Sequence, residues 1–166
     1  ISIYKASQAC GPNFAYDLCI RKVTEEQKLS LDLSPLRVYM SGAEPIRAST
    51  VRAFCEKFAN TGLHEGAFFP CFGMAENVVY ATGRGPELKK PCTINVKKTS
   101  LQPGCQVEVV DEASSETQEL VGNGFAAPGI VVAIVDPVSK KELPRGYVGE
   151  VWVAGHSKAM GYINNE

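Results

Sequence analysis

Two stretches of the chain share one pattern: LRVYMSGAEP at residues 36–45 and AFFPCFGMAE at residues 67–76. Each begins with a short apolar run, which predicts a buried strand, and each continues into small residues and a glutamate. Helical periodicity follows both stretches, beginning near Ser49 after the first and near Ala75 after the second. The order strand, loop, helix, given twice, predicts an α/β fold with a parallel sheet.

The surrounding patterns extend this layout along the first half of the chain. We expect the two strands at residues 36–40 and 67–69, with Pro70 interrupting the second. Helices are expected at residues 12–23, 49–58 and 75–81, because apolar side chains recur there at helical spacing.

The second half of the chain changes character after Gly83. Four β-branched runs, separated by turn residues, predict strands at residues 94–96, 107–110, 130–135 and 148–153. The last two are expected to pair like a hairpin, and residues 111–119 are expected to form an acidic, serine-rich loop. We therefore divide the chain into an α/β portion at residues 1–86 and a small β-barrel-like subdomain at residues 87–166.

Composition limits the possible classes of function. The 166 residues are 45% hydrophobic and carry a formal net charge of -1, which suits one soluble domain or part of a larger one. With 17 Lys and Arg against 18 Asp and Glu, the chain lacks the basic excess of a nucleic-acid-binding protein. No run approaches the roughly 20 apolar residues that span a bilayer.

Six irregularly spaced cysteines without a CxxC pair argue against a zinc site and favour reduced, buried thiols over disulfides. The start at Ile1 is neither an initiator methionine nor a signal peptide, so we expect an internal piece of a longer cytoplasmic protein.

The two loops that follow the predicted strands are the candidate sites, because ligands of α/β sheets bind beyond the carboxyl ends of the strands. In the first loop, Gly42 and Ala43 let a flat ring approach the backbone. In the second, Gly73 permits a tight turn, and Glu76 in a first helical turn suits Mg²⁺ and phosphate. Taken alone, the first loop is better explained as an ordinary turn, and Glu76 as an acidic residue that favours a helix start.

Three motifs together resemble those of the adenylate-forming superfamily, which includes acyl-CoA synthetases, luciferases and adenylation domains. Cys71–Glu76 is similar to its aromatic-Gly-x-Thr-Glu motif, 149–162 to its Gly-Glu…Gly-Tyr motif, and Ser41–Pro45 to its adenine-binding loop. Within the superfamily the chain resembles the fatty acyl-AMP ligases, whose Pro-Asn-Phe-Ala-Tyr-Asp-Leu segment matches residues 12–18.

The resemblance implies a role for each matching residue. Gly42, Ala43 and Glu44 would line the adenine of ATP. The second motif would supply the phosphate and ribose contacts, from Cys71, Phe72, Gly73, Met74 and Ala75, and Glu76 would bind Mg²⁺. Two positions depart from the usual pattern: Phe72 replaces a tyrosine, and Ala75 stands where most acyl-CoA synthetases have threonine.

By the same resemblance, the reaction is attack of a fatty carboxylate on the α-phosphorus of ATP, with pyrophosphate leaving. Residues 87–120 occupy the place of an insertion in fatty acyl-AMP ligases that disfavours CoA thioesterification, so the expected acceptor is an acyl carrier protein, as in polyketide synthesis. A variable connection without a regulatory role is the alternative for this segment.

Family parts that the chain does not contain are an upstream phosphate loop, a ribose-binding aspartate and a catalytic lysine, so we expect no activity from the chain alone. Two alternatives stay open: an acyl-CoA synthetase of the same fold, and a non-catalytic homologue that serves as an interaction module.

Overall fold

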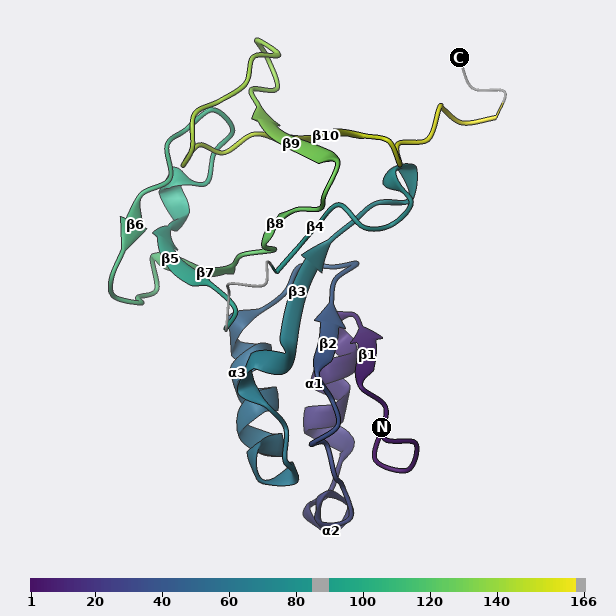
Figure 1. Cartoon of the computed structure of the whole chain (residues 1–166). Helices are drawn as coiled ribbons and strands as arrows, with labels where there is room; N and C mark the ends of the chain where they lie inside the picture. Colours follow the sequence, from purple (N-terminus) through teal and green to yellow (C-terminus); the bar gives the residue numbers. More distant parts are fainter. Residues whose placement is uncertain (85–89, 164–166) are drawn as a thin grey trace.

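The computed structural model describes residues 1–84 and 90–163 (Figure 1). Its helices are α1 (Asn13–Lys22), α2 (Glu25–Leu29) and α3 (Ala48–Phe58), with short 3₁₀ turns η1 (Ala59–Thr61), η2 (Glu65–Ala67), η3 (Ala75–Asn77) and η4 (Lys98–Ser100). Its strands are β1 (Gln8–Gly11), β2 (Val38–Ser41), β3 (Phe68–Phe72), β4 (Thr82–Gly83), β5 (Thr93–Lys97), β6 (Val109–Val110), β7 (Thr117–Val121), β8 (Phe125–Ala126), β9 (Ile130–Val135) and β10 (Glu150–Gly155).

The central sheet has the strand order β1-β2-β3-β4-β8. The first three strands run parallel, as predicted, and Tyr39 of β2 lies between Ala9 of β1 and Phe68 of β3. β4 and β8 continue the sheet in the antiparallel sense. The connections between the parallel strands carry α1 and α3, which is the arrangement that parallel neighbours require.

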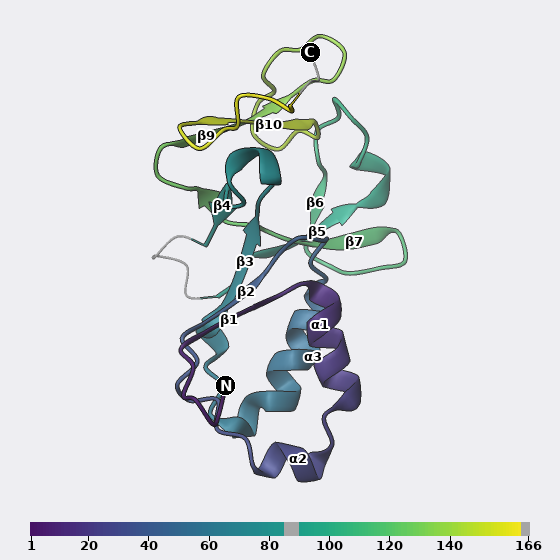
Figure 2. The ribbon, with the colours of Figure 1, turned by 90° about the vertical axis from the view of Figure 1, so that its right-hand side faces the viewer.

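Helices α1 and α3 cover one face of the parallel strands (Figure 2). Aromatic rings fill the interface: Tyr39 lies 5.0 Å from Phe68 and Tyr16 lies 5.1 Å from Phe54 between ring centroids. The core comprises buried side chains from both helices and the strands, namely Tyr16, Leu33, Leu36, Tyr39, Phe54, Phe58, Ala67 and Phe68. The helical spacing of Phe54 and Phe58 therefore marks the buried face of α3, as expected from the sequence.

A polar network joins the starts of the two helices. Asn13 is buried, donates to Thr50 Oγ1 at 3.3 Å and accepts from the backbone N–H of Arg47 at 3.0 Å. Thr50 donates to Asp17 Oδ1 at 2.9 Å. The segment at residues 12–18 that carries part of the resemblance thus fixes α1 against α3.

The described part of the second half, residues 90–163, contains strands and one 3₁₀ turn but no α-helix, in agreement with the β-branched periodicity. β5 pairs with β6 and β7 in a three-stranded antiparallel sheet, and β9 pairs with β10 over six residues. The predicted boundary between residues 86 and 87 lies outside the described residues.

Three sequence predictions are wrong in detail. β3 continues through Pro70 to Phe72, because a proline tolerates a strand position where its nitrogen faces no partner, and β4 pairs with β3 only at Cys71 and Phe72. The acidic loop at residues 111–119 ends in β7. The six cysteines are free thiols, but three are exposed and three are only partly buried.

The prediction also missed short elements: β1, α2, β4 and β8. In the part of the chain that the structure describes, no helix combines the length and the apolar character needed to cross a membrane.

Candidate functional site

The loop that follows β2 packs against the end of β3, just before the chain enters the loop at Gly73. A Cβ atom on Gly42 would lie 2.9 Å from Cys71 Sγ and 3.0 Å from the Cys71 carbonyl oxygen. Cys71 Sγ also donates to the carbonyl oxygen of Ser41 at 3.3 Å. Only glycine lets the first loop approach β3 this closely.

The remaining predicted adenine-loop residues have distinct surroundings. Ala43 is exposed and takes a left-handed backbone conformation, with φ of 66°. Glu44 accepts a hydrogen bond from the backbone N–H of Phe14, so its carboxylate is directed to the start of α1. Both residues lie in the expected loop, and their contact with a nucleotide stays a prediction.

Cys71 and Phe72 lie within β3 rather than in the loop after it, and both are half-buried. Burial raises the pKa of the Cys71 thiol, which keeps it protonated near neutral pH. The loop proper begins at Gly73, where an added Cβ would lie 1.5 Å from the Val79 carbonyl oxygen. Gly73 is therefore required by a close backbone approach inside this turn.

The predicted helix at residues 75–81 is wrong. Only the 3₁₀ turn η3 forms, because Val78 and Val79 adopt left-handed conformations with φ of 50° and 76°. The turn closes when the Val79 N–H donates to the Met74 carbonyl oxygen at 3.0 Å. Such conformations cost β-branched residues about 1–3 kcal/mol and persist only when surrounding contacts impose them.

Asn77 supplies two of those contacts. It is buried, its Nδ2 donates to the Tyr80 carbonyl oxygen at 3.1 Å, and its Oδ1 accepts from Ser157 Oγ at 3.1 Å. Asn77 therefore links the turn at residues 73–80 to the segment that follows β10. No local sequence pattern marks Asn77 or Ser157, although each stands within or beside a motif of the resemblance.

The segment at residues 156–162, here called the strap, lies along this turn (Figure 1). The Ala159 N–H donates to the Glu76 carbonyl oxygen at 2.7 Å, and the Tyr162 hydroxyl donates to Glu76 Oε1. The motif at residues 149–162 thus contacts the motif at residues 71–76, some 80 positions earlier in the chain. His156 is an exposed turn residue.

Glu76 is partly exposed and held by this contact. The hydrogen bond from Tyr162 lowers the pKa of the Glu76 carboxyl below its usual range and raises the pKa of the Tyr162 phenol. Glu76 does not lie in the first turn of an α-helix, contrary to the prediction, since η3 is a 3₁₀ turn of three residues. Of the predicted metal and phosphate site, the structure retains the Glu76 carboxylate at the turn but not the helix start.

A single carboxylate suits magnesium in this setting. Within residues 1–84 and 90–163, His, Cys, Asp and Glu do not gather in groups of three that could hold a metal by themselves. Mg²⁺ usually binds through one or two carboxylates and takes its other ligands from water and substrate phosphates. Glu76, with its second carboxylate oxygen, fits that mode.

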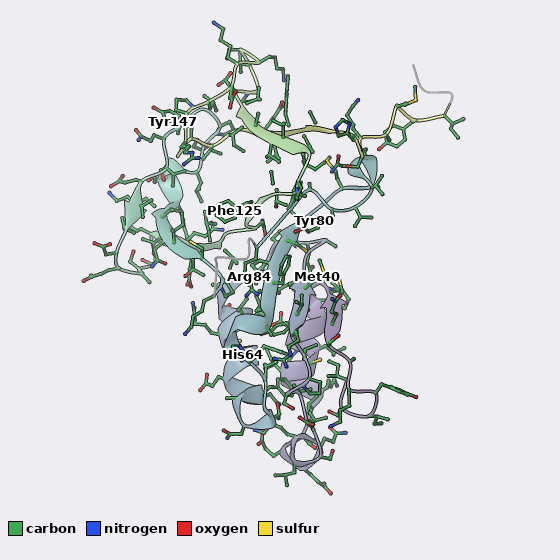
Figure 3. All side chains as sticks on the ribbon, viewed as in Figure 1. Met40, His64, Tyr80, Arg84, Phe125 and Tyr147 are labelled. Carbon is green, nitrogen blue, oxygen red and sulfur yellow. The ribbon has the colours of Figure 1, made fainter. Side chains whose placement is uncertain are left out.

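Two hollows lie near the end of the sheet, and Arg84 and Phe125, labelled in Figure 3, line one of them. A cavity of about 240 Å³ is lined by Pro70, Arg84, Phe125 and neighbouring residues, and a cleft of about 450 Å³ lies between the start of α3 and β7. Arg84 donates to the Phe68 carbonyl oxygen at 3.1 Å and lies over the Phe69 ring at 5.6 Å, so it rigidifies β3 next to the site.

Comparison with known proteins supplies an independent assignment. The chain is 35% identical over 167 residues to the medium-chain-fatty-acid–[acyl-carrier-protein] ligase JamA of Moorena producens, covering 99% of this chain and 28% of that protein. It is 37% identical over 154 residues to the long-chain-fatty-acid–AMP ligase FadD32 of Mycolicibacterium smegmatis, covering 92% of this chain and 24% of that protein. The chain therefore spans about a quarter of the length of these relatives.

Among solved structures, the fatty acyl-adenylate ligase from L. pneumophila, in complex with acyl adenylate and pyrophosphate, superposes with a TM-score of 0.91. The match has 36% sequence identity and covers 99% of this chain and 28% of that one. The family of AMP-binding enzymes matches residues 1–163. With motif order, sheet topology and family match in agreement, this chain belongs to the AMP-binding enzyme family, and its mixed α/β fold is that of an adenylate-forming N-terminal domain.

Proposed function

We propose that the whole protein is an ATP-dependent ligase that activates a fatty acid as its acyl-adenylate and passes the acyl group to a carrier protein. The observation that carries the proposal is a pair of contacts at the carboxyl end of β3: the Gly42 loop packs on Cys71, and the Glu76 turn that follows β3 is bonded to the strap. Relatives named as fatty-acid ligases, with carrier-protein or AMP in their names, support the choice of substrate.

In this proposal each part of the site has one task. The backbone at Gly42 and Ala43, the Glu44 side of the loop and the Phe72 ring would receive the adenosine. Cys71 and the turn beginning Gly73-Met74-Ala75 would approach the α-phosphate, with backbone amides replacing the hydroxyl that Ala75 lacks. Glu76 would hold Mg²⁺, which supplies charge neutralisation for the triphosphate.

The β-rich half is proposed to form the small β-barrel-like subdomain of this domain, with residues 87–120 as the insertion typical of fatty acyl-AMP ligases. Residues 87–89 of that segment lie outside the described residues. The described remainder is anchored to α3, because Arg52 donates to Glu119 at 2.6 Å. We also propose a cytoplasmic location, because the six cysteines are free thiols and thiols stay reduced in that compartment.

Pyrophosphate exchange tests the proposal. The whole protein, given ATP, Mg²⁺ and a panel of fatty acids, should exchange labelled pyrophosphate into ATP only when an acid is present. Glu76→Gln should lower this rate by at least about a hundredfold, because it removes the charge at an unchanged size. Glu142→Gln, at an exposed position between β9 and β10, is the matched control and should leave the rate unchanged.

The alternatives give different results. An acyl-CoA synthetase would convert the adenylate to acyl-CoA when CoA is added, whereas the proposed ligase needs a phosphopantetheinylated carrier protein. A non-catalytic interaction module would show no acid-dependent exchange with any member of the panel, and that result would refute the proposal.

A further inference from the structure

The strap is tied to the Glu76 turn by three hydrogen bonds from three of its residues. Ser157 binds the side chain of Asn77, Ala159 binds the backbone of Glu76, and Tyr162 binds its carboxylate. Three hydrogen bonds from six consecutive strap residues fix the position of the turn relative to the strap, which a single contact could not do.

The contact of Tyr162 differs in kind from the other two. Ser157 and Ala159 hold the fold of the turn, through a buried amide and a backbone carbonyl. Tyr162 donates to Oε1 of the partly exposed carboxylate, and one hydroxyl cannot fill the roughly four lone-pair sites of its two oxygens. Its hydroxyl therefore orients the side chain without occupying all of its ligand sites.

Glu76 needs such orientation because of where it stands. It is partly exposed and follows a loop, so an unrestrained glutamate would populate several rotamers and lose conformational entropy on binding an ion. The turn beneath it contains two strained valines, whose conformations persist only when contacts from other segments impose them. A hydrogen bond from a distant segment removes part of that freedom before the ligand arrives.

We infer that Tyr162 is a positioning residue for Glu76: its hydroxyl pre-orients the carboxylate for a divalent cation that accompanies the nucleotide. This inference rests on the proposed function for the identity of the ligand. The geometric part, a strap that restrains the turn, is independent of it.

The test replaces Tyr162 by phenylalanine in the whole protein, which removes one oxygen atom and retains the ring. The Mg²⁺ concentration for half-maximal pyrophosphate exchange should rise about fivefold, the loss expected for one partly exposed hydrogen bond to a charged group. The KM for the fatty acid should not change, since the acid does not contact this carboxylate. Tyr147→Phe is the matched control, because Tyr147 lies in the β-rich half away from this turn, as Figure 3 shows.

A second readout does not depend on activity. Amide hydrogen exchange at Ala159, whose N–H is bonded to Glu76, should be faster in Tyr162→Phe than in the parent and unchanged in Tyr147→Phe. An unchanged Mg²⁺ requirement in an active Tyr162→Phe enzyme would overturn the inference. An equal rise in the KM for the fatty acid and in the Mg²⁺ concentration required would also overturn it, because it would indicate general damage to the site.

If the parent protein shows no pyrophosphate exchange, the proposed function fails. The amide hydrogen exchange measurement then tests by itself whether Tyr162 restrains the turn. Faster exchange at Ala159 supports the restraint of the turn by Tyr162, and unchanged exchange refutes it.

Discussion

The carboxylate of Glu44 accepts a hydrogen bond at 2.6 Å from the backbone N–H of Phe14, 30 positions earlier in the chain. Phe14 is in the first turn of α1, where Pro12 precedes the helix and no side chain of the helix's own start caps it. In the opposite direction, the Asn13 side chain at the start of α1 accepts a hydrogen bond from the N–H of Arg47, just before α3. The predicted adenine loop is thus coupled to both helix starts.

Glu44→Ala should destabilise the protein by about 1 kcal/mol, because it leaves a helix N-terminal donor without its partner. Glu44→Gln keeps an acceptor oxygen and should lose less. Urea denaturation of the whole protein measures both changes, and faster exchange of the Phe14 amide locates the effect. Equal stability of parent and Glu44→Ala would show that the cap contributes nothing.

Gly73→Ala should destabilise the protein by about 3 kcal/mol or more, because the new Cβ would lie 1.5 Å from the Val79 carbonyl oxygen and the turn cannot yield without moving. Gly122→Ala is the control. Its Cβ would meet Cys92 at an ordinary 3.6 Å, so the change should stay within about 0.5 kcal/mol. The thermal midpoints of the two variants decide the point: similar values would contradict the close approach.

Asn77→Ala should cost about 1–3 kcal/mol, because it removes both bonds of a buried amide and leaves the Tyr80 carbonyl oxygen without that donor. Ser157→Ala should cost less. A double-mutant cycle should give a coupling of about 1 kcal/mol between the two residues. Asn123→Ala, at an exposed position, should be neutral. Strict additivity in the cycle would argue that the strap does not hold the turn.

The ion pair between Arg52 and Glu119 should couple by at most about 1 kcal/mol, since the arginine side chain is largely exposed. Arg52 holds the pKa of the Glu119 carboxyl below its usual range. Because the folded-state pKa is the lower one, the stabilisation is present above the unfolded pKa and is lost as the pH falls through the folded pKa. Double-mutant cycles at neutral pH and along a series of falling pH values should show the coupling and then its loss. A coupling that persists in acid would contradict this assignment.

Much of the fold could be predicted because its signals are local. The periodicity of α3 and the β-branched run of β9 each lie within about a dozen residues, and both elements occupy the predicted positions. Short elements such as β4 and β8 were missed because two residues carry no periodicity, and they exist only through pairing with each other and with β3.

The candidate site likewise has features that follow from local sequence and features that follow only from tertiary contacts. Sequence alone determined which loops follow the parallel strands, that Gly73 is in a tight turn, and that Glu76 follows it by three residues, since residue type and spacing suffice for these. Tertiary structure decided that residues 75–81 form a strained turn in place of a helix, that Glu44 faces α1, and that Tyr162 meets Glu76. The physical reason is that these outcomes depend on hydrogen bonds between segments 30 to 86 positions apart, whose geometry no local pattern contains.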